Sequence, residues 1–166
     1  MKKQAPDAID LLDADHLQVH ALFQSYRELV RKGATPLQRR TLAEEICTEL
    51  SIHAKLEEEL FYPAVRDVLD DEDIVDEAED QHGSLRELVG QILATSPEDA
   101  LYDARVTVLS EYVERHVRTE REQVFNRVLA ARMDLQSLGR SIAVRKEELR
   151  AVSEALREDA LAQALA

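Results

Sequence analysis

Two residue pairs in this sequence place a glutamate four positions after a histidine: His53 with Glu57, and His116 with Glu120. Residues four apart in a helix point to the same side, so each imidazole can bind the same metal ion as its carboxylate. The first pair lies in the stretch SIHAKLEEELFYP (residues 51–63), on a helical face that is otherwise apolar. A buried carboxylate without a partner is strongly disfavoured, so a bound cation would explain why Glu57 is tolerated there.

Two further histidines, His16 and His82, lie alone on the apolar faces of their own predicted helices. A single core histidine is more often a hydrogen-bonded structural group than a ligand. Here four helices each carry one, at depths that meet in one layer of an antiparallel bundle. His16 precedes His53 by 37 residues and His82 precedes His116 by 34, so the chain resembles one helical hairpin used twice.

The number of candidate ligands indicates the kind of metal site. Four histidines and two glutamates are too many for one tetrahedral zinc ion. Two carboxylates that can each bridge favour a pair of metal ions, as in di-iron and di-manganese bundles. The donor set itself suits either two iron ions or two manganese ions.

Four amphipathic helices are needed to position these residues, and apolar side chains recur at the required spacing of three and four. Pro6-Asp7 opens the first helix and Lys32-Gly33 closes it, while Thr35-Pro36 opens the second. The second helix extends to Leu69 or breaks near Pro63.

The second half of the chain follows the same plan. The third helix begins after the acidic run Asp70 to Asp73, which suits the positive end of a helix. Ser96 as N-cap and Pro97 in the first turn are predicted to open the fourth helix. A weaker break at Ser137 to Gly139 precedes a fifth segment of about residues 139–163 with a narrower apolar stripe.

These patterns predict an all-α fold, an up-down-up-down four-helix bundle with an additional C-terminal helix. Residues 1–134 would form the metal-binding bundle and residues 135–166 the C-terminal helical extension. We expect the extension to dock on its own bundle in a monomer, with a homodimer as the alternative.

The composition supports the helical fold and excludes some partners. The 166 residues are 45% hydrophobic and 33% charged, with only four glycines and four prolines. The net charge of −13 disfavours a phosphate-binding surface, so neither nucleic acid nor an anionic membrane is an expected partner. Cys47 is the only cysteine, which excludes an intrachain disulfide, and we expect it to be a small core residue.

Features of targeting or membrane insertion are missing from the sequence. No stretch approaches the roughly 20 apolar residues of a membrane span. The lysines at positions 2 and 3 are not followed by the apolar run of a signal peptide. We therefore expect a cytoplasmic protein.

The same residues resemble the hemerythrin-like, HHE cation-binding family, over roughly residues 8 to 130. The matching stretches are DHLQVHALF (15–23), HAKLEEELFYP (53–63), EDQH (79–82) and HVRTE (116–120). The resemblance implies a four-helix bundle with a non-haem di-iron centre, in which each glutamate bridges the two irons. On this ground we expect two carboxylate-bridged iron ions in preference to manganese. The ligands would then be His16 and His53 for one iron, His82 and His116 for the other, and Glu57 and Glu120 as the bridges.

The sequence departs from the oxygen-carrying hemerythrins in two places. Those carriers have two histidines four apart on the third helix, whereas Ala78 and Arg86 lie at that spacing from His82. They also have an aspartate five positions after the last histidine, where this chain has Arg121. The centre would therefore have open positions or recruit a further ligand.

Two residues are further candidates for that ligand. His20 lies one turn from His16 but about 40° round the helix, and the alternative is a surface histidine. Glu79 lies one turn before His82 and could form an E-x-x-H ligand pair, with a solvated acidic face as the alternative.

Three more polar residues near the stripes are assigned structural roles. Tyr112, one turn before His116, is expected in the core, where its hydroxyl could hydrogen-bond close to the ligands. Glu58 and Glu59 are expected to be surface charges.

The predicted function is that of a di-iron protein that binds oxygen or a related small oxidant, for sensing, storage or detoxification. The apolar lining would slow water access to the reduced metals; it comprises Leu12, Val19, Leu50, Leu85 and Val113. One alternative is a di-iron oxidoreductase that consumes peroxide or nitric oxide, which the open positions favour. Another is a metal-dependent regulatory interaction module, supported only by the fifth helix.

Overall fold

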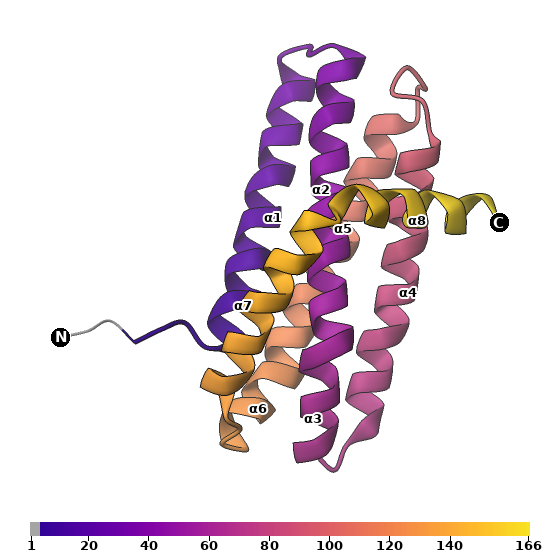
Figure 1. Cartoon of the computed structure of the whole chain (residues 1–166). Helices are drawn as coiled ribbons and strands as arrows, with labels where there is room; N and C mark the ends of the chain where they lie inside the picture. The colour runs from indigo at the N-terminus through magenta and orange to yellow at the C-terminus, as the bar shows by residue number, and fades with distance from the viewer. Residues whose placement is uncertain (1–3) are drawn as a thin grey trace.

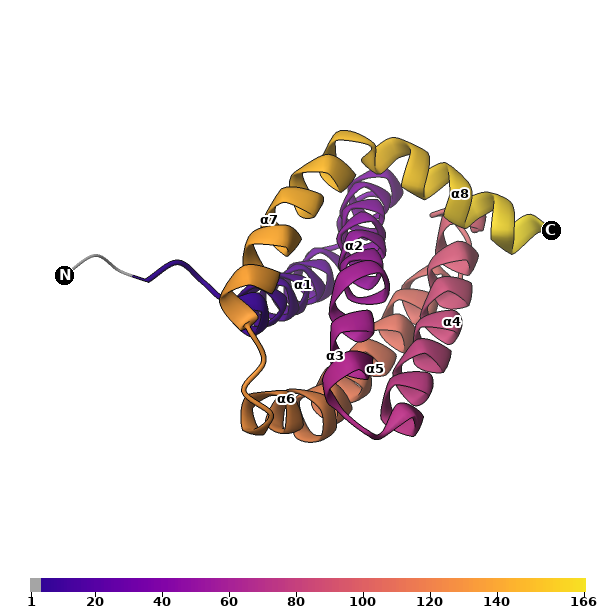
Figure 2. The same ribbon diagram turned by 60° about the horizontal axis from the view of Figure 1, so that its bottom comes forward.

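The structure of the protein is a computed structural model that describes residues 4–166, so the N-terminal lysines lie outside the described residues. Four long helices run alternately up and down around a common centre, as the sequence predicted (Figures 1 and 2). They are α1 (Ala8–Arg31), α2 (Pro36–Leu56), α4 (Glu72–Ala94) and α5 (Tyr102–Thr119). The predicted all-α, up-down-up-down bundle is therefore confirmed.

The ends of the first hairpin follow the predicted signals. Asp7 caps α1 and Thr35 caps α2, each through a capping box in which side chains and backbone N–H groups are paired reciprocally. Gly33 follows α1 with a φ of 70°, a left-handed conformation that favours glycine.

The predicted start of the fourth helix is wrong. Residues 97–101 form turns and a bend, and α5 begins only at Tyr102. The Asp99 carboxylate accepts a hydrogen bond from the backbone N–H of Leu101 at 2.8 Å. This hydrogen bond satisfies the Leu101 N–H within a turn, and such local side-chain bonds compete with helix formation.

Two of the long helices continue beyond the candidate glutamates through a wider, π-helical turn. Glu57 begins the first such turn and Glu120 begins the second. The elements are η1 (Glu57–Phe61) followed by α3 (Tyr62–Val68), and η2 (Glu120–Phe125) followed by α6 (Asn126–Ala130). The second helix thus passes through Pro63, which lies in the first turn of α3, where its missing N–H is tolerated.

The C-terminal extension consists of two helices, α7 (Leu135–Ala151) and α8 (Ser153–Leu165), rather than the single helix expected. They wrap round the outside of the bundle: α7 packs on α1 and α2, and α8 packs on α2 and α4 (Figure 2). Six buried apolar residues join α7 and α8 to α1 and α2: Ala8, Ile52, Leu56, Ile142, Leu149 and Leu156.

The predicted break at Ser137 to Gly139 is wrong as well. Helix α7 begins earlier, after Asp134, whose side chain accepts a hydrogen bond from the backbone N–H of Ser137. Gly139 has a different purpose: a Cβ atom there would lie 2.9 Å from the backbone nitrogen of Ala8. The glycine therefore allows α7 to cross the start of α1 closely.

The bundle core is apolar towards both ends and polar between them. Towards the α1–α2 and α4–α5 connections, the cluster includes Phe23, Ile46, Cys47, Ile92 and Leu109. Towards α3 and α6, it includes Leu12, Phe61, Val65, Val75 and Val128. Between these clusters lie buried histidines and glutamates, so the apolar ends enclose a polar layer that must satisfy its own hydrogen-bonding groups.

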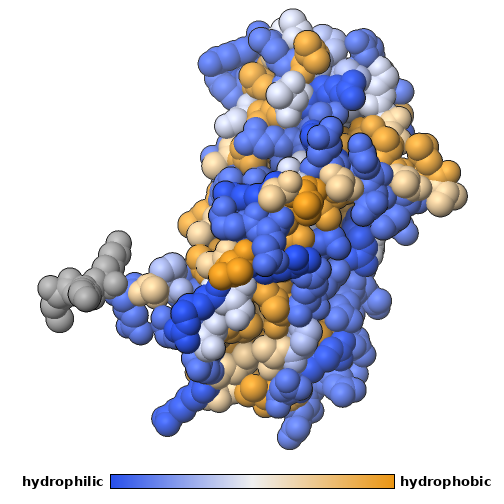
Figure 3. Space-filling view, in the orientation of Figure 1, coloured by the Kyte–Doolittle hydropathy of each residue, from blue (hydrophilic) through white to orange (hydrophobic). Residues whose placement is uncertain are grey.

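The outer surface is mostly hydrophilic on the face crossed by α7 and α8 (Figure 3). Hydrophobic residues appear on that face in several separate places, one of them at the C-terminal end of α8 (Figure 3). Leu165, in the last turn of α8, is exposed. Within residues 4–166, no helix combines the length and the hydropathy needed to cross a bilayer.

Candidate metal centre

The six main candidate ligands predicted from the sequence lie together at the middle of the bundle. Their nitrogen and oxygen atoms form two groups that could each hold a metal ion, and Glu57 belongs to both. The first group is His16, His53, Glu57 and Glu120; the second is Glu57, His82 and His116. All six side chains are buried, and Glu57 is fully inaccessible to solvent.

The histidines face each other in two pairs across the bundle. The Nε2 atoms of His16 and His53 lie 3.0 Å apart, and those of His82 and His116 lie 3.3 Å apart. Each pair joins the two helices of one hairpin, so the internal repeat of the sequence corresponds to a repeat of the site.

Each histidine also has a partner at its outer ring nitrogen, Nδ1. The contacts join His16 to Asp13 (3.3 Å), His53 to Asp15 (3.1 Å), His82 to Glu58 (3.0 Å) and His116 to the side-chain oxygen of Gln81 (2.6 Å). All four partners present an oxygen that accepts a hydrogen bond, which holds a proton on Nδ1 and turns the Nε2 lone pair inwards. Two lone pairs 3.0 Å apart repel each other unless a proton or a metal ion lies between them.

The two glutamates lie between the histidine pairs, and each directs one oxygen towards either pair. The Oε1 atom of Glu57 contacts His53, while its Oε2 lies 3.4 Å from Nε2 of His82. The Oε1 of Glu120 lies 3.4 Å from Nε2 of His16, and its Oε2 lies 3.8 Å from Nε2 of His116. This is the arrangement that two bridging carboxylates require.

Three of the four glutamate oxygens lack a hydrogen-bond donor among the described residues: both oxygens of Glu57 and Oε1 of Glu120. Buried, unpaired carboxylate oxygens are strongly unfavourable, because burial removes their water without replacing it. Metal cations would satisfy these oxygens and the inward lone pairs together. The residues present therefore fit a two-metal centre.

The two glutamates differ in their expected charge without metal. Burial raises the pKa of Glu57, but the charge of His53 and the close imidazoles of His16 and His82 outweigh it and hold the pKa well below its usual range. Burial and the nearby charge of Glu57 raise the pKa of Glu120 to about 7. Glu57 is thus ionised in the metal-free chain, while Glu120 is partly protonated near pH 7.

The histidines of the second pair also differ from each other. Burial lowers the pKa of His82, but the nearby carboxylates of Glu57 and Glu58 outweigh it and raise the pKa to about 9. Burial lowers the pKa of His116 to about 4. In the metal-free chain, protons compensate part of the charge that metal ions would balance, and metal binding would release them.

Tyr62 adds a phenol to this polar layer. Its hydroxyl donates to Oε2 of Glu120 at 2.7 Å and lies 3.3 Å from Nε2 of His82. Burial raises its pKa well above the usual value, so it is a neutral donor. Tyr62 follows Glu57 by five residues, the repeat of a π-helical turn, and its backbone N–H donates to the Glu57 carbonyl.

Sequence reasoning missed most of the residues around the candidate ligands. Glu58 was expected to be a surface charge, but it contacts Nδ1 of His82. Tyr112 does hydrogen-bond near the site, donating to the Gln81 carbonyl at 3.2 Å. The residues that carried no predicted role are Asp13, Asp15, Tyr62 and Gln81. Asp15 and Gln81 each directly precede a candidate histidine, a signal that could have identified them.

The two additional candidates lie away from the polar layer. The His20 side chain is 49% exposed and lies 3.8 Å from the carboxylate of Glu114. Glu79 is half-exposed and pairs with Arg66 at 3.1 Å. Neither belongs to the groups of residues that could share a metal ion.

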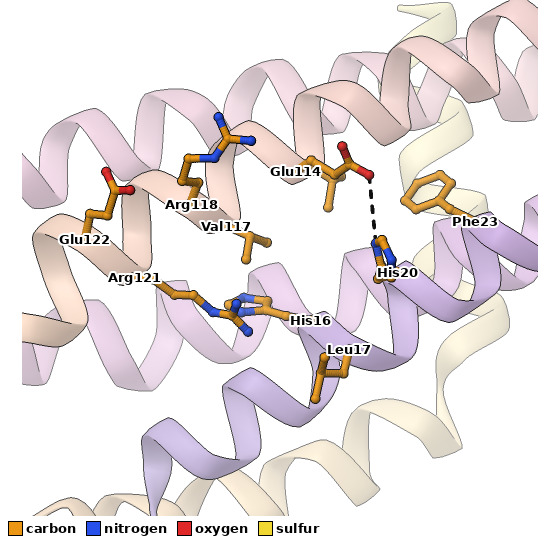
Figure 4. Close-up of a pocket in the computed structure, with 10 residues that line it drawn as sticks. His16, Leu17, His20, Phe23, Glu114, Val117, Arg118, Arg121 and Glu122 are labelled. Atoms are coloured by element: carbon orange, nitrogen blue, oxygen red, sulfur yellow. Dashed lines mark ion pairs between the residues drawn. The ribbon is translucent and has the colours of Figure 1, made fainter.

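A groove of about 610 Å³ opens from the surface between α1 and the α5–η2 helix, with His16 in its lining (Figure 4). Arg118 and Arg121 line its α5–η2 side, and His20 and Glu114 face each other across it (Figure 4). The groove offers a solute a path from the surface to His16, one of the candidate ligands.

Comparisons with known proteins agree with this geometry. The model of the Hemerythrin HHE cation binding domain matches residues 7–128. A protein of Nostoc sp. (strain PCC 7120), named a DNA nickase, is 31% identical over 123 residues. That match covers 74% of this chain but 34% of the relative, so the chain spans about a third of the relative's length.

A solved structure extends the likeness to the C-terminal helices. It is the Hemerythrin HHE cation binding domain-containing protein of Mycobacterium kansasii, a homolog of Rv2633c, with a TM-score of 0.78 and 23% identity. The match covers 96% of this chain and 99% of the neighbour, well beyond residue 128. The shared fold therefore includes the C-terminal extension as well as the bundle.

Proposed function

The chain belongs to the hemerythrin HHE cation-binding family, and from this premise we propose that it is a non-haem di-iron protein that binds oxygen or a related small oxidant. His16 and His53 would bind one iron, and His82 and His116 the other. Glu57 and Glu120 would bridge them. Ferrous ions bound there would supply the two electrons needed to reduce a small oxidant.

One observation carries this proposal: two inward-facing histidine pairs are joined by two carboxylates that each direct one oxygen to either pair. A single metal ion would bind one histidine pair and leave the Nε2 lone pairs of the other pair facing each other. A zinc site built for structure is closed by four ligands, whereas these six donors are divided over two centres. Nitrogen and carboxylate donors together suit iron or manganese.

A small apolar cavity beside the histidines suits the proposed ligand. It has a volume of about 20 Å³ and touches all four candidate histidines. Its remaining lining includes the aliphatic residues Val19, Leu50, Leu85, Val113 and Val117. A space of this size takes one water-sized molecule, and the apolar walls favour an uncharged diatomic or peroxide over an ion.

The test is metal analysis of protein produced with iron supplied, followed by optical spectra after reduction and after exposure to air. We expect two irons per chain and a visible absorption that disappears on reduction and returns with oxygen. One metal per chain, or zinc alone under those conditions, would contradict the di-iron proposal. Manganese loading of the same stoichiometry would preserve the geometry but change the metal.

An oxidoreductase that consumes peroxide or nitric oxide is the second candidate. Ala78 and Arg86 occupy the positions one turn on either side of His82, so the second histidine pair has no additional histidine to complete it. The groove that reaches His16 gives a larger solute a path towards the first pair. Rapid mixing of the reduced protein with excess peroxide distinguishes the candidates. Repeated consumption of peroxide in the presence of a reductant supports the oxidoreductase, and uptake that stops at one equivalent per centre supports binding.

The activity named for the Nostoc relative is that of a much longer protein. The match includes only about a third of that protein. A net charge of −13 also opposes binding to a phosphate backbone.

A further inference from the structure

The carboxylates behind the candidate histidines share a second feature: each is itself paired with a cation. Each pair joins different elements of the fold, so none results simply from neighbouring positions on one helix. The pairs are Asp13 with Arg121 (2.9 Å), Glu58 with Arg86, and Asp15 with Lys146. The fourth partner, Gln81, is a neutral amide and needs no cation.

The Asp15 pair differs from the other two in burial and in origin. Arg121 and Arg86 are half-exposed, but the side chains of Asp15 and Lys146 are 7% and 18% exposed. Lys146 comes from α7, which lies beyond the residues that match the family model. Asp15 divides its two oxygens, one to Nδ1 of His53 and the other to Lys146.

We propose that the C-terminal helix α7 is a functional part of the metal centre, in which Lys146 acts through Asp15 as a positioning residue that tunes His53. This inference rests on the proposed two-iron site. It gives the C-terminal extension a role in the centre. Lys146 sets the charge behind His53, and with it the affinity and the reduction potential of the iron bound at the first histidine pair.

The physical basis is electron donation by the imidazole. An uncompensated carboxylate at Nδ1 draws the ring proton outwards and makes Nε2 a stronger donor to the metal. A stronger donor stabilises ferric over ferrous iron. Lys146 balances the Asp15 charge, so it limits this effect and favours the reduced state. Because the pair is buried, solvent screens this charge less than it would at the surface.

Burial also explains why this contact is fixed in place. Both Asp15 oxygens are paired in this buried place, one with Nδ1 of His53 at 3.1 Å and the other with the ammonium of Lys146. The side chains of Asp15 and Lys146 are 7% and 18% exposed, so water cannot easily replace either partner. Removing Lys146 would leave a buried carboxylate whose remaining partner is His53, a change that acts directly on the histidine.

The experiment compares Lys146→Met with the wild type in the full chain loaded with iron. We expect the ratio of ferric to ferrous binding to rise about tenfold, which corresponds to a reduction potential about 59 mV more negative for a one-electron couple. A redox titration followed by visible absorption measures the potential, and iron release to a chelator measures affinity. Lys146→Arg should restore the wild-type values because it retains the cation.

Two further variants separate tuning from simple docking of the helix. Arg145→Met removes a neighbouring α7 cation that pairs with Glu59 and contacts none of the histidine partners, so it should leave the potential unchanged. In an Asp15→Asn background, Lys146→Met should add no further shift, because the charge through which it acts has gone. Thermal melts of the metal-free variants report any loss of folding separately.

The outcomes distinguish this inference from the proposed function. A wild-type chain that does not bind two irons would overturn the proposed function. A wild type with two irons whose potential is unaffected by Lys146→Met would overturn the inference alone. Equal shifts in Lys146→Met and Arg145→Met would also overturn it, because they would reflect net charge or docking.

Discussion

The hairpin α1–α2 and the hairpin α4–α5 each give the centre two histidines and one glutamate, yet their ionisation differs sharply. In the first, the pKa of Glu57 is held well below its usual range; in the second, burial and the charge of Glu57 raise the pKa of Glu120 to about 7. The outer partners differ too, with two aspartates behind the first pair and one glutamate and one neutral amide behind the second. Equal ligands therefore do not make equal sites, because surrounding charges decide how each ligand behaves.

Removing the two glutamates in turn should give the largest effects and should expose this asymmetry. Glu57 is shared by both candidate groups, so Glu57→Ala should lose both metals. Glu120→Ala should retain part of the metal, because the second group includes His82, His116 and Glu57 without it. Elemental analysis of the two variants, prepared identically, measures the difference. Unchanged metal content in Glu57→Ala would exclude it as a bridge.

The pH dependence of metal binding should differ between His82 and His116. With a pKa of about 9, His82 is protonated at pH 7 in the metal-free chain, whereas His116, at about 4, is not. Metal must displace the His82 proton, so apparent affinity should rise about tenfold per pH unit between pH 6 and 8, for that proton alone, and level off above about 9. Competition titrations with a chelator at several pH values measure this. Affinity independent of pH would contradict it.

The stability of the metal-free chain should show the opposite trend from the same histidine. The folded-state pKa of His82 is above its ordinary value of 6.5, so its stabilising contribution is complete below about pH 6.5. That contribution is lost as the pH rises through about 9. Urea unfolding of metal-free protein at pH 6 and pH 9 tests the sign, with His82→Gln as the control that should reduce the difference.

The π-helical turns offer two equivalent positions, one in each hairpin, at which variants can be compared. Tyr62 and Phe125 each follow a glutamate by five residues, so they occupy the same position in the two hairpins. Tyr62 donates to Glu120, whereas the Phe125 ring stacks against His16 with centroids 6.0 Å apart. Tyr62→Phe makes the hairpins alike and removes the donor, so metal affinity should fall about tenfold, the lower range for loss of a group that supports a ligand.

Phe125→Leu is the matched control for that variant. It removes an aromatic ring at the equivalent position but no hydrogen bond to a carboxylate. A chelator competition should therefore show a smaller loss of affinity than in Tyr62→Phe. Equal losses would indicate that packing at the π-helical turns, not the phenol, supports the centre.

The candidate ligands could be predicted from the sequence, whereas Tyr62, which hydrogen-bonds to one of them, could not. The four histidines and two glutamates were found because they interrupt apolar stripes with a spacing of three and four. Tyr62 was missed because that spacing assumes an α-helix, whereas a π-helical turn brings the fifth residue to the same face. Likewise, Pro97 predicted a helix start near residue 97, but a local hydrogen bond to the Asp99 side chain stabilises a turn there, and α5 begins at Tyr102.

Outer partners were harder to predict, for a geometric reason. Glu58 reaches His82 from a different helix, and it stands beside Glu59 in an acidic run that resembles a solvated face. Lys146 lies in a segment whose docking depends on tertiary packing, including the close crossing at Gly139. Periodicity determines which face of a helix is buried but gives no register between helices, and these contacts depend on that register.

The smallest expected effect concerns the residue four positions after the first histidine of each hairpin. In the first hairpin this residue is His20, half-exposed and 3.8 Å from Glu114. In the second it is Arg86, which pairs with Glu58 behind His82. His20→Ala should therefore leave metal content and affinity unchanged, because an exposed pair contributes little and touches no candidate ligand. Arg86→Ala should weaken metal binding severalfold, because Glu58 loses its cation while still contacting His82. If His20→Ala removed iron instead, the α1 helix would have to turn inwards on metal binding. His20 would then replace the histidine that the third helix lacks.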